Sequence, residues 1–209
     1  MPADRLLVLH GLRLKGFAEA VGVSSLFGLD EADVAIAMKE LADDGLVLRR
    51  DGRVAGWSLT TDGRAIEAAL LADELEQAGP AARAAIEAAF ARFQEINGDL
   101  LDVCTAWQLK SVDGAQTIND HADVGYDAAT IRRLGEVHEA AVPTVRALGD
   151  ALPRFERYET RLADALAKVE AGQTEWFTKP LLDSYHTVWF ELHEDLLSTL
   201  GLQRGAQNR

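Results

Sequence analysis

The stretch that decides the fold is ELADDGLVLRRDGRVAGWSLTTDGRA, residues 40–65. Two runs rich in branched and aromatic residues, 46–50 and 53–59, flank the dipeptide Asp51-Gly52. An Asp-Gly pair between two such runs favours a β-hairpin, because both residues tolerate the positive φ of a tight turn. The glycine before the first run ends a helix, and the threonine pair after the second run begins another. The stretch therefore predicts helix, hairpin and helix in that order.

Short helices are also predicted upstream of the hairpin, over residues 4–14, 16–22 and 30–44. Asp30 can accept hydrogen bonds from the free N–H groups in the first turn of the third helix. The apolar residues of that helix recur at i, i+3, i+4 and i+7, which places Val34, Ala37, Met38 and Leu41 on one buried face. Residues 1–78 are therefore expected to form the first domain.

Helices followed by a hairpin in this order resemble a winged helix-turn-helix. The resemblance rests on residues 40–65, with a Gly-Leu-Val turn into a strand, a basic hairpin and a Ser-Leu-Thr-x-x-Gly-Arg exit. MarR-like, PadR-like and ArsR-like bacterial regulators share this combination, and the similarity covers about the first third of the chain. It implies a transcription regulator whose third helix enters the DNA major groove while the hairpin, or wing, flanks it.

The candidate DNA-binding residues are Lys39, Arg49, Arg50 and Arg53. The three arginines lie at or beside the tip of the wing, where they can contact phosphates or the minor groove. The third helix argues against DNA, because residues 29–44 hold six acidic side chains and one lysine. Its outward face also lacks the Arg, Asn and Gln side chains that read base edges. Two interpretations stay open: a DNA-binding winged helix, and a winged helix used as a structural or protein-docking module.

The composition is that of a globular protein of 209 residues, with 48% apolar and 26% charged residues. A net charge of −13 argues against coating nucleic acid or an anionic membrane by bulk charge. Cys104, the single cysteine, cannot form an internal disulfide and is expected to be buried. The N-terminus does not resemble a signal peptide, and no run approaches the roughly 18 apolar residues of a membrane span. We therefore expect a soluble, cytoplasmic protein.

The second domain, residues 80–204, is expected to be an antiparallel bundle of long helices, which makes the fold class mainly α. The predicted helices cover 81–112, 127–152, 153–172 and 180–200, with a polar loop over 113–126. Gly79-Pro80 divides the two domains. Pro153 and Pro180 suit the first turns of their helices, and Pro143 predicts a kink. Long helices joined by short links pack antiparallel.

Two segments of this second domain carry residue types that often form binding sites. The loop NDHADVGYD, residues 119–127, crowds polar side chains, and SYHTVWFELHEDLL, residues 184–197, places histidines and a tryptophan on one helix face. A pocket is predicted whose lining residues are Trp107, Asn119, Asp120, His121, Asp123, Tyr126, His186, Trp189 and His193. Because the loop brings carboxylates and no Lys or Arg, its small-molecule ligand should carry hydrogen-bond donors or a positive charge. The alternative is a buried hydrogen-bond network that pins the loop to the last helix.

No metal site, cofactor or catalytic residue is predicted. His186 and His193 are separated by about 10.5 Å along a helix axis at 1.5 Å per residue, too far to bind one ion easily. The sequence holds no Gly-rich phosphate loop and no nucleophile–base pattern, so an enzyme built on the 119–127 loop is the least favoured interpretation.

A second resemblance covers nearly the whole chain. LRLKGFAEA at 12–20, the Gly-Trp-Ser-Leu-Thr exit, the Asn-Asp-His loop and SYHTVWFELHEDLL together look like a helical module found in some bacteria. That module occurs at the end of proteins related to pyruvate phosphate dikinase and other phosphoenolpyruvate-utilising enzymes, and also as free-standing proteins. The resemblance implies a regulatory or docking partner of such an enzyme.

The sequence thus predicts a dimeric winged-helix transcription regulator that binds DNA through its first domain. The second domain would serve dimerisation and the sensing of a small molecule. A homodimer is expected because two-fold operators are read by two-fold proteins. The alternative is a protein-interaction module that does not bind DNA and is associated with a phosphoenolpyruvate-utilising enzyme.

Overall fold

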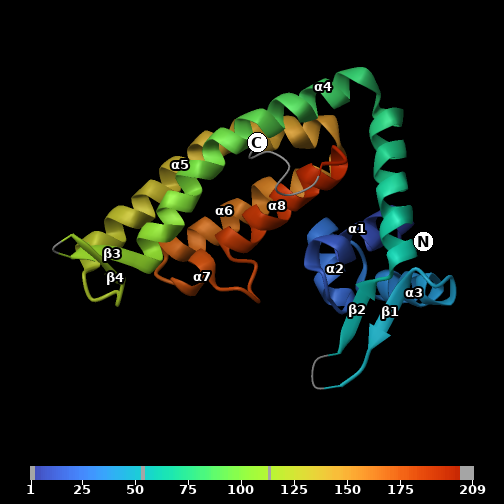
Figure 1. The fold of residues 1–209 in the computed structure, drawn as a ribbon, viewed down its shortest axis with the longest axis horizontal. Helices are drawn as coiled ribbons and strands as arrows, with labels where there is room; N and C mark the ends of the chain where they lie inside the picture. Colours follow the sequence, from blue (N-terminus) through green and yellow to red (C-terminus); the bar gives the residue numbers. More distant parts are fainter. Residues whose placement is uncertain (1–2, 53–54, 113, 203–209) are drawn as a thin grey trace. The chain divides into compact units, whose positions relative to one another are not determined.

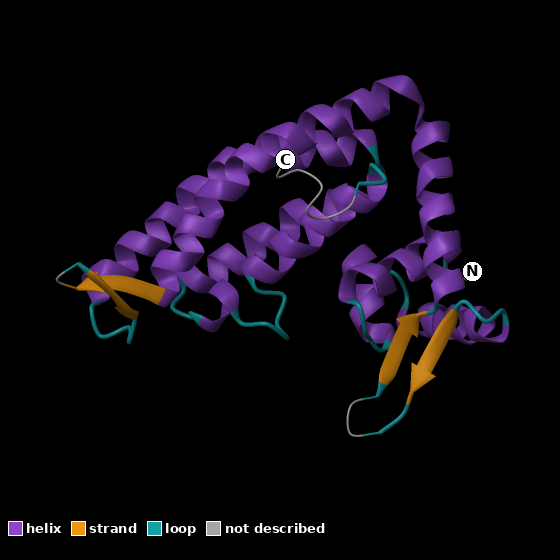
Figure 2. Cartoon of the chain, viewed as in Figure 1, coloured by secondary structure: helices purple, strands orange, loops and turns teal. Residues whose placement is uncertain are grey.

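The structure is a computed structural model that describes residues 3–52, 55–112 and 114–202. It is mainly helical, as predicted, with small antiparallel sheets (Figure 2). In chain order its elements are α1 (Arg5–Lys15), α2 (Ala20–Phe27), α3 (Glu31–Asp43), β1 (Val47–Arg50), β2 (Gly56–Leu59), α4 (Thr61–Gln108), β3 (Leu109–Val112), β4 (Ala115–Ile118), α5 (Val124–Ala151), a 3-10 turn η1 (Pro153–Phe155), α6 (Glu156–Glu170), α7 (Glu175–Thr178) and α8 (Tyr185–Thr199). No helix of the described ranges is both long and apolar enough to cross a membrane.

The chain divides into two compact units. The first unit comprises residues 1–83 and 193–209, and the second unit comprises residues 84–192. The first division lies close to the predicted boundary at Gly79-Pro80. The second division, between residues 192 and 193, lies inside α8, so the last helix contributes residues to both units. The sequence patterns do not predict this division.

The first unit is built on α1, α2 and α3 (Figure 1). Asp30 caps α3 by accepting hydrogen bonds from the backbone N–H groups of Ala32 and Asp33, as predicted. The predicted apolar stripe of α3 is buried. The core residues are Val8, Leu9, Leu12, Ala20, Val23, Val34, Ala37, Met38, Leu41, Leu46, Val47, Trp57 and Leu59. Burial of this stripe against α1 and α2 supplies the hydrophobic stabilisation that positions α3.

The second helix differs from the prediction, which placed it over 16–22. It covers Ala20–Phe27 instead, because Gly16 ends α1 and Gly28 ends α2. Gly28 adopts the left-handed conformation at φ 68° and donates its N–H to the carbonyl of Ser24, as C-terminal glycines of helices commonly do.

The hairpin predicted around Asp51-Gly52 forms, although its second strand, Gly56–Leu59, is shorter than the predicted run 53–59. β1 and β2 pair antiparallel from Val47 opposite Leu59 to Arg50 opposite Gly56. Trp57 also pairs with Ala18 in the link between α1 and α2, through backbone hydrogen bonds of 3.0 and 2.8 Å. β2 of the hairpin is therefore anchored to the link between α1 and α2.

The helix α4 contains the predicted break. Gly79 has φ 86° and ψ 176°, which are not helical values, and Pro80 begins the helical segment after it. At Asn97-Gly98 the helix continues. Ile96 and Leu100 on either side are buried, and their packing outweighs the roughly 1 kcal/mol that glycine costs in a helix.

A hairpin replaces the end of the helix predicted over 81–112 and part of the loop predicted over 113–126. β3 and β4 pair antiparallel, from Leu109 opposite Ile118 to Val112 opposite Ala115, and Gly114 has φ 81°. The dipeptide Asp113-Gly114 is the same turn signal as Asp51-Gly52. The sequence does not reveal this second hairpin, because β4 is exposed along its whole length and lacks the alternation of apolar and polar residues that marks a strand. α5 begins at Val124 rather than near Asp127, and Asp123 caps it.

The long helices of the second unit pack through side chains that face one another. Phe93 of α4 stacks on Trp189 of α8, with ring centroids 4.6 Å apart. Arg161 of α6 contacts Glu191 of α8 at 2.5 Å. The last helix begins at Tyr185 and not at Pro180. Leu181 adopts φ 85°, a conformation that does not continue into a helix.

Candidate functional site

The predicted DNA-binding residues lie on α3 and on the hairpin of the first unit. Lys39 is exposed on α3, and Arg49 and Arg50 are exposed at the end of β1. Arg53 lies outside the described residues. Whether any of them contacts DNA stays a prediction.

Arg49 is held by acidic neighbours. Its guanidinium donates hydrogen bonds to Asp51 at 2.9 Å and to Glu19 at 3.3 Å, and it lies over the ring of Trp57. The hydrogen bonds to Asp51 and then Glu19 raise the pKa of this guanidinium above its ordinary value. The positive charge of Arg49 is therefore largely compensated within the protein.

Arg50 is different, because it lines a surface hollow of about 440 Å³ together with a second arginine. We name this the basic hollow. Its residues are Gly16, Phe17, Arg50, Ser58, Leu59 and Arg64. Neither arginine forms an ion pair with any residue in the described ranges. Arg64 belongs to the Ser-Leu-Thr-x-x-Gly-Arg exit, but it was not predicted as a binding residue because its partner lies on a different element.

The outward surface of α3 combines acidic and apolar groups. Glu31, Glu40 and Asp43 are exposed on this helix, beside the single cation Lys39. Ile36 is 50% exposed, although an isoleucine usually lies in a protein core. This surface has the wrong charge for phosphate and an apolar side chain that DNA does not require.

The loop at 119–127 forms a hydrogen-bonded network. Asn119 is buried, and its amide donates to the carbonyl of Trp107 at 3.1 Å and to Asp127 at 2.8 Å. His121 Nδ1 lies 2.9 Å from Asp127 Oδ2, and its ring contacts the ring of Trp107. Tyr126 donates its hydroxyl hydrogen to the carbonyl of Leu109. These contacts join the loop to the end of α4 and account for its concentration of polar residues.

Two acidic residues of the predicted pocket have structural partners. Asp123 accepts from the backbone N–H of Tyr126 as the cap of α5. Asp120 contacts Lys110 of β3 at 2.5 Å, and this hydrogen bond lowers the pKa of the Asp120 carboxyl. Lys110 thus brings a cation next to a loop that by itself holds none.

The predicted pocket residues of α8 have contacts away from that loop. Trp189 donates its indole hydrogen to Asn97 Oδ1 at 2.9 Å and stacks on Phe93. His186 is half-buried, and burial lowers the pKa of its imidazole. His193 belongs to the first unit. The printed contacts of Trp189 are with α4, and ligand binding by these residues stays a prediction.

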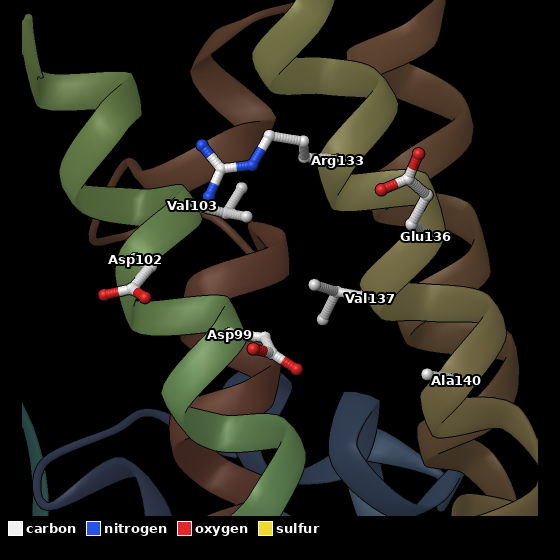
Figure 3. Close-up of a pocket in the computed structure, with 7 residues that line it drawn as sticks. All are labelled: Asp99, Asp102, Val103, Arg133, Glu136, Val137 and Ala140. Atoms are coloured by element: carbon white, nitrogen blue, oxygen red, sulfur yellow. The ribbon is translucent and has the colours of Figure 1, made fainter.

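A second hollow, of about 220 Å³, lies between α4 and α5 (Figure 3). Figure 3 shows Arg133 reaching from α5 towards α4, above Val103. The residues that line this hollow are Asp99, Asp102, Val103, Arg133, Glu136, Val137 and Ala140. This hollow was not predicted from the sequence, because alternating charges on a helix normally mark a solvated face.

A buried charge cluster occupies the first unit. His10 of α1 is fully buried, with Nδ1 2.8 Å from Glu67 Oε1 and Nε2 3.1 Å from Asp195 Oδ1. Glu67 lies on α4 and Asp195 on α8, and both are buried. The cluster was not predicted either, because His10 lies in a leucine-rich helix 57 and 185 positions away from its partners.

Cys104 is buried, as predicted, and burial raises the pKa of its thiol to about 12. Burial likewise raises the pKa of the nearby Tyr185 hydroxyl. A thiol that stays protonated is a weak nucleophile, so Cys104 acts as a packing residue. No group of three or more His, Cys, Asp or Glu residues in the described ranges is arranged to hold a metal ion.

Neither the protein-family models, nor the curated proteins, nor the solved structures contain a match to this chain. Its function is therefore inferred from the geometry of the chain itself.

Proposed function

We propose that the chain is a DNA-binding transcription regulator whose first unit is a winged helix-turn-helix. One observation carries the proposal: β1 and β2 form a hairpin that is anchored to the link between α1 and α2 and exposes Arg50, which has no acidic partner in the described ranges, beside the paired Arg49. A hairpin fixed beside a compact helical core can place arginines against a phosphate backbone without first being ordered.

The hairpin, and not α3, supplies most of the binding energy in this proposal. From Glu31 to Asp43 the helix α3 holds four acidic residues and one lysine. Phosphates repel the carboxylates of these acidic residues at short range. Arginines form paired hydrogen bonds with phosphate oxygens, and each phosphate contact releases counterions from the DNA. Binding should therefore depend strongly on salt and only weakly on sequence.

The proposal includes a homodimer, with the second unit providing helix surface for association and for sensing a small molecule. A two-fold dimer would present two hairpins to successive turns of the duplex. Light scattering should then give a mass of about twice 22.7 kDa. A monomer at tens of micromolar would contradict the dimeric regulator.

A second candidate function is a protein-docking module that does not bind DNA. Ile36 favours it, because this side chain is half exposed on α3 among acidic neighbours. An apolar side chain surrounded by charged residues is a common feature of protein interfaces. The partner that the sequence suggests is a phosphoenolpyruvate-utilising enzyme.

Fluorescence anisotropy with the full chain distinguishes the two candidates. The probes are a labelled duplex from upstream of the gene and an unrelated duplex, each titrated at low and at physiological salt. The double variant Arg49→Ala/Arg50→Ala should weaken binding to both duplexes. It should also reduce the slope of log affinity against log salt by about 0.9 for each phosphate that is no longer neutralised.

The matched control is Arg92→Ala/Arg157→Ala, which removes the same charge from exposed positions of the second unit. This control should bind like the wild type. Equal reductions of affinity in both double variants would show a general charge effect and contradict a hairpin interface. If the wild type binds neither duplex at low salt, the docking function is favoured.

A further inference from the structure

The two arginines of the basic hollow carry positive charge that the described part of the protein does not compensate. Other arginines of the first unit have acidic partners: Arg5 contacts Asp44, and Arg13 contacts Glu194. Arg50 and Arg64 have no such partner in the described ranges, although the chain carries a net charge of −13. Two uncompensated guanidinium groups beside one hollow form a site that favours an anion.

The elements that bear these arginines are fixed to each other. Gly63, immediately before Arg64, lies so close to Leu46, the residue before β1, that a Cβ atom there would be 2.0 Å from the Leu46 carbonyl oxygen. Thr60 strengthens this contact, because its hydroxyl donates to the carbonyl of Leu46 and accepts from the N–H of Gly63. The first turn of α4, with Arg64, is therefore held against Leu46, the residue at which the chain enters β1.

The opposite wall is also packed. The ring of Phe17 lies against Gly56, where an added Cβ would be 2.8 Å from the ring carbons. The neighbouring Ala18 pairs with Trp57 of β2. The hollow is therefore formed before any ligand arrives, and binding does not require these segments to become ordered.

The lining indicates the chemistry of the ligand. Guanidinium groups bind phosphate through two parallel hydrogen bonds, and the Ser58 hydroxyl is a further donor. Phe17 and Leu59 add an apolar wall that a bare phosphate would not use. At about 440 Å³ the hollow also falls in the size range of small-molecule sites. These features fit a phosphate together with the sugar to which it is linked.

We propose that the basic hollow binds one sugar-linked phosphate of a DNA backbone, and that Arg64 is a phosphate-binding residue beside Arg50. This inference rests on the proposed DNA-binding function and adds to it a contact outside the hairpin. Asp51 and Glu19, two acidic residues beside the hairpin, are both engaged by Arg49. They therefore oppose the phosphate less than free carboxylates would.

The test measures the salt dependence of binding between the full chain and a labelled duplex. Arg64→Ala should reduce the slope of log affinity against log salt by about 0.9, the value for one phosphate contact. Arg64→Lys keeps the charge and should restore most of the slope. Arg157→Ala, the control on α6, should leave the slope unchanged. All variants should melt at the wild-type temperature, since Arg64 is exposed.

The outcomes separate the inference from the function on which it rests. If the wild type binds DNA and Arg64→Ala leaves the slope unchanged, the phosphate contact of the basic hollow is wrong and the proposed function stands. If the wild type binds no duplex at low salt, calorimetry with a free mononucleotide and with inorganic pyrophosphate tests the hollow alone. Nucleotide binding that Arg64→Ala abolishes would support the sugar–phosphate chemistry but overturn DNA as its source. Binding of neither compound would overturn the inference entirely.

Discussion

At the scale of single residues, two glycines of the same helix illustrate opposite roles. Gly63 lies in the first turn of α4, where an added Cβ would be 2.0 Å from the carbonyl oxygen of Leu46. Gly98 lies later in α4, and an added Cβ there would meet nothing within 4 Å. One glycine permits a close approach between a helix and a strand, whereas the other only loosens a helix.

We expect Gly63→Ala to destabilise the protein and Gly98→Ala to stabilise it. The backbone must move apart in the first variant, which costs about 1–3 kcal/mol, as overpacking typically does. The second variant gains about 0.5–1 kcal/mol from the higher helix propensity of alanine. Chemical denaturation of both variants against the wild type measures the difference. A change of the same sign in both would show that the contact with Leu46 does not determine the effect.

At the scale of elements, the charge cluster ties α1, α4 and α8 together in the core of the first unit. Both nitrogens of the His10 ring face carboxylate oxygens, and Thr199 also donates to Asp195. A neutral imidazole carries a single N–H, so both contacts are hydrogen bonds only when the ring is protonated or one carboxyl keeps its proton. The cluster therefore depends on a proton as well as on its side chains.

We expect His10→Ala to be among the most damaging single substitutions. It leaves Glu67 and Asp195 buried without the ring that separates and binds them, and breaking a buried ion pair in this way costs about 3–5 kcal/mol. Arg5→Ala is the control, because its pair with Asp44 is half exposed and worth about 1 kcal/mol or less. Urea denaturation gives both values. A loss below about 1 kcal/mol for His10→Ala would contradict this account of the cluster.

At the scale of the whole molecule, two histidines make stability depend on pH. Burial lowers the pKa of His138 below its ordinary value, although Glu159 and other acids oppose this, and burial also lowers the pKa of His186. The unfolded chain therefore binds protons at these histidines more readily than the folded chain does. Their contribution to stability is complete above the ordinary imidazole pKa of about 6.5 and is lost as the pH falls below it.

We expect the free energy of unfolding to fall between about pH 7 and pH 5, before the carboxylates begin to titrate. The variant His138→Gln/His186→Gln should show a smaller fall over this range, because its replacement side chains do not take up a proton. Denaturation curves at several pH values for both proteins provide the comparison. If the free energy of unfolding falls equally in the two proteins, groups other than these two histidines cause the acid sensitivity.

The amino-acid sequence by itself determined the features that depend on neighbours in the chain. Asp51-Gly52 specifies a hairpin, Gly79-Pro80 specifies a break in α4, and the spacing of Val34, Ala37, Met38 and Leu41 specifies the buried face of α3. Each signal acts within a few residues, through φ preference, missing N–H groups or helical periodicity. The β3–β4 hairpin shows the limit of such signals, because an exposed strand lacks the apolar alternation that would reveal it.

Only the tertiary structure decided which charged groups meet. His10 contacts Asp195 across 185 positions of the chain, and Arg64 lines the same hollow as Arg50 because Gly63 allows α4 to approach Leu46, the residue before β1. The polar loop around Asn119 became a bonded network because α4 ends beside it. The sequence around a charged residue looks the same whether its side chain is solvated, paired with another charge or available to a ligand. The state of the side chain depends on which distant residues the packing of the core brings within a few ångströms.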